Sequence, residues 1–109
     1  MDCAAFAPSN RLDLSIWHPD FVPLSFYKIF GFPTGVGCLL ARKSPLAKLR
    51  RPWFAGGTCV FSSVLAADAT GRGFYLAPGE ARFEDGTINY LLLPAVEIGL
   101  RYMSPLGLR

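Results

Sequence analysis

Lys28 is the residue of this sequence whose chemistry most needs an explanation. It stands in the stretch SFYKIFGFPTGVG, between Tyr27 and Ile29, inside an apolar run that is followed by three glycines and a proline. An ammonium group costs several kcal/mol to bury without a partner. Lys28 is therefore either exposed by an irregular turn or held there for its chemistry.

A lysine at the end of a strand, close to the hydroxyl of Ser25 and ahead of a glycine-rich turn, suits a Schiff base with an aldehyde. Burial among aromatic side chains disfavours the ammonium and can bring the lysine pKa far below its usual value of about 10.4. Pyridoxal phosphate is the common aldehyde cofactor held this way, with an aspartate or arginine beside its ring nitrogen. The alternative is that Lys28 is a surface lysine whose stem covers apolar neighbours.

Two other motifs that could use the glycines of this stretch fail. Gly35-Val36-Gly37 could begin a dinucleotide-binding fingerprint, but Leu40 stands at the third glycine and a strand is expected to follow. A phosphate-binding Walker loop ends in Gly-Lys-Ser or Gly-Lys-Thr, whereas Lys28 precedes these glycines. Neither motif explains the lysine.

Composition limits the class of protein. The 109 residues suffice for one domain, 51% of them are hydrophobic and 17% are charged. No apolar run approaches the roughly 18 residues of a membrane-spanning helix, and the first residues lack the basic start of a secretory signal. We expect a soluble, cytoplasmic protein that binds no membrane.

Charged, cysteine and histidine residues exclude further classes. Five of the eleven basic residues fall between Arg42 and Arg51, and we interpret them as the solvated face of a short helix because no nucleic-acid motif accompanies them. Three cysteines without CxxC spacing make disulfides and a zinc site unlikely candidates, and His18 alone cannot supply a three-histidine metal site. A Ser-His-Asp triad would depend on that one histidine.

The order of predicted elements indicates an α/β layer structure. Strands are expected at 20–26, 36–42, 59–66 and 74–77, with a loop at 52–58 and a turn at 68–73. Ser44 followed by Pro45 predicts a helix start, and apolar residues at helical spacing predict a last helix, with Pro94 in its first turn. The second strand is apolar almost throughout, which is typical of a mainly parallel sheet covered on both faces.

Four blocks of the sequence resemble blocks of a known protein family, and they occur in the same order as in that family. They are DCAAFAPSNRLDL, DFVPLSFYKIFGFPTGVGCLLARK, FAGGTCVF and FEDGTINYLLLPAVEIGLRY. This is similar to the class V aminotransferase and cysteine desulfurase family, most closely its molybdenum cofactor sulfurase branch. The resemblance implies a fold type I pyridoxal-phosphate-dependent transferase whose large domain is a mainly parallel sheet with flanking helices.

The resemblance also implies roles for individual residues. Lys28 would carry the cofactor, Asp2 would pair with its pyridinium nitrogen, and Ser25 would donate to its phosphate. Tyr27 stands where desulfurases usually have histidine, so its interpretation as a phosphate contact competes with that of a packed aromatic. Thr58 would reach the cofactor phosphate of a neighbouring subunit in a homodimer.

Four further positions complete this comparison. Glu84, Gly86 and Thr87 resemble the turn that closes the site, with helix capping as the alternative role of Glu84. Ala5 stands where desulfurases have a glutamine that touches the cofactor. None of the three cysteines matches the residue that accepts sulfur as a persulfide.

We expect residues 1–109 to be part of the large domain, without its N-terminal part and without the C-terminal small domain. A sheet divided in this way predicts exposed apolar faces, poor solubility and weak cofactor retention. The leading hypothesis is a piece of an enzyme that mobilises sulfur from cysteine. The alternatives are another class V aminotransferase or epimerase, and a non-catalytic remnant of the fold.

Overall fold

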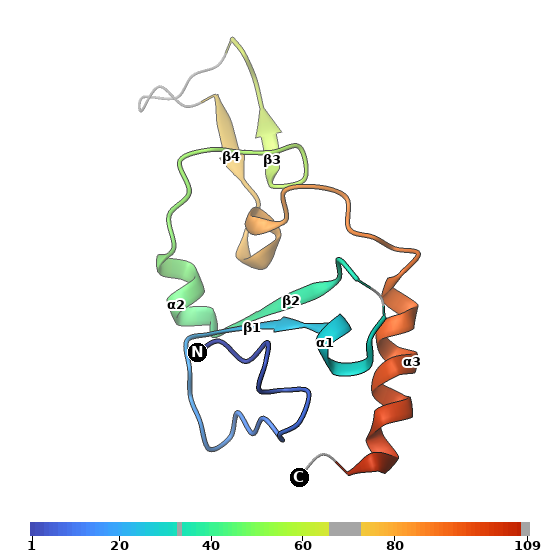
Figure 1. Ribbon diagram of the computed structural model, residues 1–109. Coiled ribbons are helices and arrows are strands. Elements are labelled where there is room, and N and C mark those ends of the chain that lie inside the picture. The colour runs from blue at the N-terminus through green and yellow to red at the C-terminus, as the bar shows by residue number, and fades with distance from the viewer. Residues whose placement is uncertain (33, 66–72, 108–109) are drawn as a thin grey trace. The chain divides into compact units, whose positions relative to one another are not determined.

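The protein consists of two compact units, described here from a computed structural model that covers residues 1–32, 34–65 and 73–107. The first unit contains Met1–Arg42 and Asn89–Arg109, and the second contains Lys43–Ile88. Figure 1 traces the chain through both units from blue to red.

The centre of the first unit is a two-stranded antiparallel hairpin. Strand β1 (Phe21–Ser25) pairs with β2 (Gly37–Ala41), in a register that sets Ser25 opposite Gly37. Gly37 cannot carry a side chain here, because a Cβ atom would lie 2.6 Å from the Leu24 carbonyl oxygen. Within the hairpin Val22 is only 2% exposed, so it anchors the small core of this unit.

The first residues of the chain extend this hairpin along β1. The amino group of Met1 donates to the Phe21 carbonyl at 2.8 Å, and the N–H of Cys3 donates to the Pro23 carbonyl at 3.4 Å. Both pairs advance together, so this segment runs in the same direction as β1. Its Cys3 side chain is 1% exposed and adds to the core beside the strand.

Helix α1 (Phe26–Phe30) follows β1 without a break. Phe26 and Phe30 stack at the i and i+4 positions with ring centroids 6.1 Å apart. Gly31 ends the helix in the left-handed region at φ 81°, where its N–H donates to the Tyr27 carbonyl at 2.8 Å. The sequence predicted a glycine-rich turn here and did not predict the helix.

Helix α3 (Leu93–Met103) completes the first unit beside α1, as Figure 1 shows, and η2 (Ser104–Leu106) continues it. Pro94 lies in its first turn, as predicted, where a missing N–H costs nothing. A Cβ atom at Gly99 would lie 2.6 Å from the ring of Phe30, so the glycine permits the contact between the two helices. Ile98 and Tyr102, which the periodicity assigned to the apolar face, are 67% and 76% exposed.

The second unit contains α2 (Lys43–Lys48), a hairpin and a short 3₁₀ helix. Strand β3 (Cys59–Ser62) pairs antiparallel with β4 (Phe74–Leu76), and η1 (Gly79–Phe83) follows β4. The predicted loop at 52–58 holds no helix or strand in the structure. Most of the predicted turn at 68–73 lies outside the described residues.

The predicted mainly parallel pairing is wrong for both ladders of the described residues, which are antiparallel. The reason lies in the connection between β1 and β2, which contains α1 and a tight turn and brings the chain straight back beside the first strand. The only parallel neighbour in the first unit's described part is the Met1–Cys3 segment, held by two hydrogen bonds. The described residues therefore contain strands of an α/β domain, but the two ladders that they form are antiparallel.

Candidate functional site

Lys28 lies in the middle of α1 and is exposed to solvent. Its ammonium makes no hydrogen bond or ion pair with any residue that the structure describes. The predicted burial among aromatic side chains is wrong, because Phe26 and Phe30 stack on each other one turn apart and leave the lysine between them on an open face. Lys28 is thus an available amine held on a helix that glycine ends within one turn.

Ser25 and Tyr27 flank Lys28 in the same segment. Ser25 is half-buried at the junction of β1 and α1, with extended backbone angles, and its hydroxyl does not cap the helix. Tyr27 is 44% exposed, so the structure does not pack it as a core aromatic. The sequence Ser25-Phe26-Tyr27-Lys28 therefore presents a hydroxyl, a phenol and an amine within a single strand-to-helix junction.

Asp2 lies beside β1 rather than at its end. One of its carboxylate oxygens accepts the N–H of Ala4 at 2.9 Å. Asp2 also lines a mainly apolar cavity of about 260 Å³, and the other lining residues come from the same N-terminal region: Met1, Cys3, Phe6, Leu12 and Trp17. Lys28 is not among them.

The hydrogen bonds of Met1 and Cys3 place Asp2 alongside the middle of β1, whereas Lys28 lies one helical turn beyond the end of that strand. Asp2 thus lies beside β1 and Lys28 lies beyond its end, and Lys28 does not line the cavity that Asp2 lines. Their joint contact with one cofactor ring stays a prediction.

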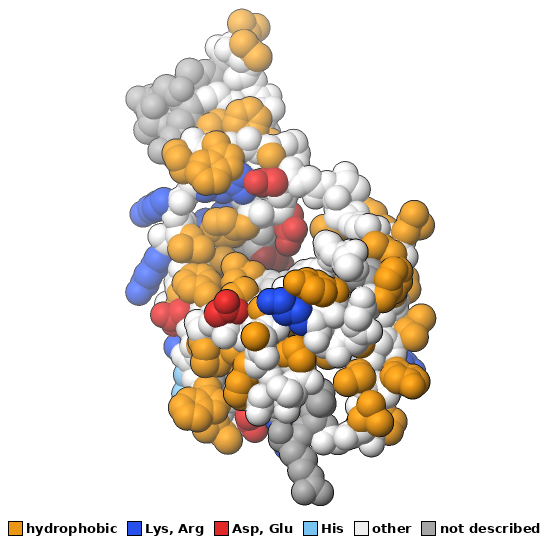
Figure 2. All heavy atoms as spheres, in the orientation of Figure 1, with side chains coloured by type: hydrophobic (Ala, Val, Ile, Leu, Met, Phe, Trp, Pro, Cys, Tyr) orange, Lys and Arg blue, Asp and Glu red, His pale blue; other side chains and the backbone are white. Residues whose placement is uncertain are grey.

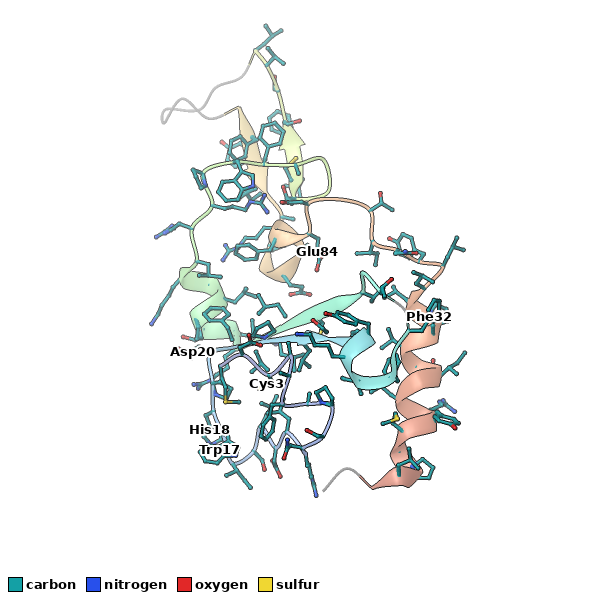
Figure 3. The ribbon with its side chains drawn as sticks, viewed as in Figure 1. Cys3, Trp17, His18, Asp20, Phe32 and Glu84 are labelled. Atoms are coloured by element: carbon teal, nitrogen blue, oxygen red, sulfur yellow. The ribbon has the colours of Figure 1, made fainter. Side chains whose placement is uncertain are left out.

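The loop before β1 carries the only histidine of the chain. Figure 3 shows His18 beside Trp17 in this loop, with Asp20 at the start of the strand. His18 is exposed, and it lines a cavity of about 200 Å³ together with Val22 and Arg42. Arg42 and Asp20 form an exposed ion pair of 3.5 Å across the hairpin, which stabilises the fold little.

Thr58, in the second unit, is fully buried and uses its hydroxyl inside its own loop. The Oγ1 atom donates to the Ala55 carbonyl at 2.9 Å and accepts the Ala55 N–H at 2.8 Å. Its own carbonyl accepts the N–H of Ala77 at 2.7 Å, which ties the loop to the end of β4. The hydroxyl holds the glycine loop closed, and its predicted role as a phosphate contact stays a prediction.

The glycine loop and the predicted closing turn contact each other within the second unit. A Cβ atom at Gly57 would lie 2.9 Å from the Glu84 carbonyl oxygen, whereas a Cβ atom at Gly56 would meet nothing within 4 Å. Gly57, and not Gly56, therefore permits a close backbone approach to residue 84. Glu84 itself is exposed and follows η1, as Figure 3 shows, so it does not cap α3.

Sequence reasoning missed a buried arginine in the second unit. The side chain of Arg51 is 5% exposed, donates to the carbonyls of Trp53 and Arg82 and forms an ion pair with Asp85. Its guanidinium also stacks 5.0 Å from the Trp53 ring centroid. The interpretation of the basic run as a solvated helix face is wrong for Arg51, because its partner lies 34 residues away and no local spacing signals it.

Two side chains of the first unit have shifted pKa values. Burial raises the pKa of the Cys38 thiol on β2, so the thiol stays protonated at neutral pH. The pKa of Asp13 is lowered, first by the Ser15 hydroxyl and then by the Ser15 N–H, both of which donate to its carboxylate. Neither residue belongs to the predicted site.

The cysteines Cys3, Cys38 and Cys59 are free, and the residues that the structure describes hold no cluster of three or more potential metal ligands. Within the same residues, no helix is long and apolar enough to cross a membrane.

Comparison with known proteins decides the family. The sequence pattern of the family described as Aminotransferase class-V matches residues 1–109. The chain belongs to this family. The predicted resemblance is confirmed, and the family is pyridoxal-phosphate dependent.

Molybdenum cofactor sulfurases are among the relatives of the chain. The chain is 49% identical over 102 residues to the molybdenum cofactor sulfurase of Bos taurus, covering 91% of this chain and 11% of the relative. It is 46% identical to that of Homo sapiens over 101 residues, with coverages of 91% and 11%. For Caenorhabditis elegans the identity is 40% over 107 residues, with coverages of 98% and 14%. The chain thus spans between a tenth and a seventh of these relatives.

A solved structure supports the fold. The apo structure of a cysteine desulfurase from Thermococcus onnurineus NA1 superposes with a TM-score of 0.80 at 30% sequence identity, covering 98% of this chain and 25% of the desulfurase. This confirms the predicted class of a partial fold type I domain, although the two ladders of this chain are antiparallel. The chain therefore carries a section of a class V fold.

The donor set of the first unit fits the family's cofactor. An exposed lysine amine, a half-buried serine hydroxyl and a carboxylate with one oxygen free of internal bonds lie on β1, α1 and the segment beside them. An amine binds an aldehyde, a hydroxyl donates to phosphate and a carboxylate pairs with a protonated pyridine nitrogen. These are the groups that pyridoxal phosphate requires.

Proposed function

We propose that this chain supplies the cofactor-lysine segment of a pyridoxal-phosphate-dependent sulfurase that takes sulfur from cysteine. The observation that carries this proposal is Lys28, an exposed amine without a partner among the described residues, in a chain 40–49% identical to molybdenum cofactor sulfurases. Residues 1–109 form part of the large domain of such an enzyme, which acts as a homodimer in the cytoplasm.

The residues divide the work of holding the cofactor. Lys28 would hold its aldehyde carbon, Asp2 would pair with its ring nitrogen, and Ser25 would donate to its phosphate. Tyr27 would add a phenol on the same helix, whereas Thr58 keeps its hydroxyl inside its own loop. When bound, the cofactor supplies an electron sink for the charge that develops on the substrate's α-carbon.

Lys28 would have a second task during the reaction. Its amine would remove the proton from the α-carbon of cysteine and return a proton later, which is general base and then general acid catalysis. The sulfur atom passes to an acceptor thiol, which becomes a persulfide, and cysteine minus its sulfur leaves as alanine. The exposure of Lys28 suits this movement, because no internal ion pair has to break first.

A titration with pyridoxal phosphate tests the proposal. The wild-type chain should develop the visible absorbance band of a lysine-bound cofactor, and Lys28→Ala should lose it. Lys43→Ala serves as the matched control, since Lys43 is also exposed on a helix, and it should keep the band. Equal spectra for wild type and Lys28→Ala would contradict the proposal and favour a non-catalytic remnant of the fold.

A further inference from the structure

The second unit contains a cavity of about 510 Å³ that the proposed function does not use. Six residues line it. Three are arginines, Arg50, Arg51 and Arg82, and the other three, Leu49, Pro52 and Leu76, are apolar. None of these six described residues carries a carboxylate. We propose that this arginine cavity binds the phosphate group of a small molecule.

Fixed geometry supports this proposal first. Arg51 donates to the Arg82 carbonyl at 2.8 Å, and Arg82 donates through one terminal nitrogen to the Leu46 carbonyl at 2.8 Å. Each guanidinium also stacks on an aromatic ring, that of Arg51 on Trp53 and that of Arg82 on Phe83. Two of the three arginines are therefore held in place before any ligand arrives, which reduces the entropy cost of binding.

Unsatisfied polar groups supply the second argument. The Nε atom of Arg82 is buried and has no hydrogen-bond partner among the described residues. A buried N–H without an acceptor destabilises a fold, and it is rare enough to need an explanation. Arg82 lines the cavity, so a ligand oxygen there would offer this N–H an acceptor once the side chain turns its Nε toward the ligand.

The balance of charge supplies the third argument. Among the described residues, only Arg51 of the three has a carboxylate partner, Asp85, while Arg50 and Arg82 have none. The cavity thus holds two positive charges in excess. A phosphate dianion balances them, and the planar guanidinium group suits its oxygens. Figure 2 shows basic side chains gathered at the surface over this part of the chain.

Calorimetric titration of the full chain with inorganic phosphate at constant ionic strength tests this site. Phosphate should bind saturably, and acetate should bind more weakly because it offers one fewer charge. Arg50→Gln should weaken phosphate binding roughly tenfold. Arg50 is exposed and makes no internal bond among the described residues, so this variant should keep its fold, which circular dichroism checks.

Two controls separate this site from other causes of phosphate binding. Lys43→Gln removes one positive charge from the same unit outside the cavity and should change the affinity less than about twofold. Lys28→Ala, which abolishes the proposed function, should leave phosphate binding intact. The inference is overturned if binding never saturates, if Arg50→Gln binds like wild type, if Lys43→Gln or Lys28→Ala weakens binding as much as Arg50→Gln does, or if acetate binds as tightly as phosphate.

Discussion

The two units of the molecule treat their polar residues in opposite ways. In the second unit Arg51 and Thr58 are buried and bonded to backbone carbonyls of the loops around them. Among the described residues of the first unit the buried side chains are the apolar Cys3 and Val22, and the exposed amine of Lys28 has no partner. Buried polar groups thus help to hold the second unit together, whereas the first unit leaves the amine of Lys28 available.

This difference separates structural from chemical roles. A hydroxyl with two hydrogen bonds inside its own loop, like that of Thr58, is already occupied by folding. A lysine with none has only external partners to find. The same family resemblance covers both residues, so the contrast predicts that substitutions in the second unit affect stability and that substitution of Lys28 affects chemistry.

The largest stability effect is expected at Arg51. Arg51→Ala removes two hydrogen bonds to carbonyls, the ion pair with Asp85 and the contact with Trp53, and should lower the free energy of unfolding by about 2–4 kcal/mol. Urea titration of both variants measures this. Arg50→Ala, one residue away and exposed, should stay within about 0.5 kcal/mol. If both substitutions lowered the free energy of unfolding equally, the predicted difference between the buried Arg51 and the exposed Arg50 would be contradicted.

Thr58→Val should follow in size. The substitution keeps the shape of the side chain but leaves the Ala55 N–H without its acceptor, so we expect a loss of roughly 1–3 kcal/mol in thermal or urea unfolding. Thr87→Val is the matched control in the same unit, because Thr87 is exposed and has no hydrogen bond among the described residues. A neutral Thr58→Val would show that the hydroxyl is spare and would strengthen its assignment to phosphate.

Adjacent glycines give a sharper comparison of smaller size. Gly57→Ala places a Cβ atom 2.9 Å from the Glu84 carbonyl oxygen and should destabilise the second unit by about 1 kcal/mol. Gly56→Ala meets nothing and should be neutral or stabilising by ~0.4–1 kcal/mol, since alanine restricts the unfolded chain. If urea unfolding shows that the two substitutions change the free energy of unfolding in opposite directions, the contact between the glycine loop and residue 84 is confirmed. Equal changes would contradict it.

The smallest effect is expected at Asp13, in the first unit. Its folded pKa lies below the ordinary value of 3.8, so its ionised form favours the fold above that pH, and this contribution is lost as the pH falls through the folded pKa. Ser15→Ala removes the main donor and should raise the pKa toward 3.8, measured by NMR titration of the carboxyl carbon. Ser44→Ala, which removes a hydroxyl from the other unit, should leave it unchanged.

Local sequence signals predicted the elements that depend on local chemistry. Strands β1 and β2 and the start of α3 at Pro94 all follow from apolar runs and proline placement. Helix α1 escaped prediction because five residues are too few to show a helical period. Its stabilising features, the stacking of Phe26 on Phe30 and the left-handed Gly31, become visible only when the turn is formed.

The sequence predicted the residue types of the candidate site better than it predicted the burial and contacts of these residues. Ordered blocks around Lys28 identified the family, which the comparison confirmed. The expected burial of Lys28 failed because neighbours in sequence do not determine which face of a short helix turns outward. The pair of Arg51 and Asp85 could not be predicted, since 34 residues separate them and neither stands in a recognisable motif.

The central claim is that Lys28 is the amine that holds the cofactor, and covalent mapping tests it most directly. The chain has three lysines, Lys28, Lys43 and Lys48, all of them exposed. After incubation with pyridoxal phosphate and reduction with borohydride, peptide mass spectrometry should find the pyridoxyl group concentrated on Lys28. An even distribution over the three lysines would contradict the claim, because it would show only the general reactivity of surface amines.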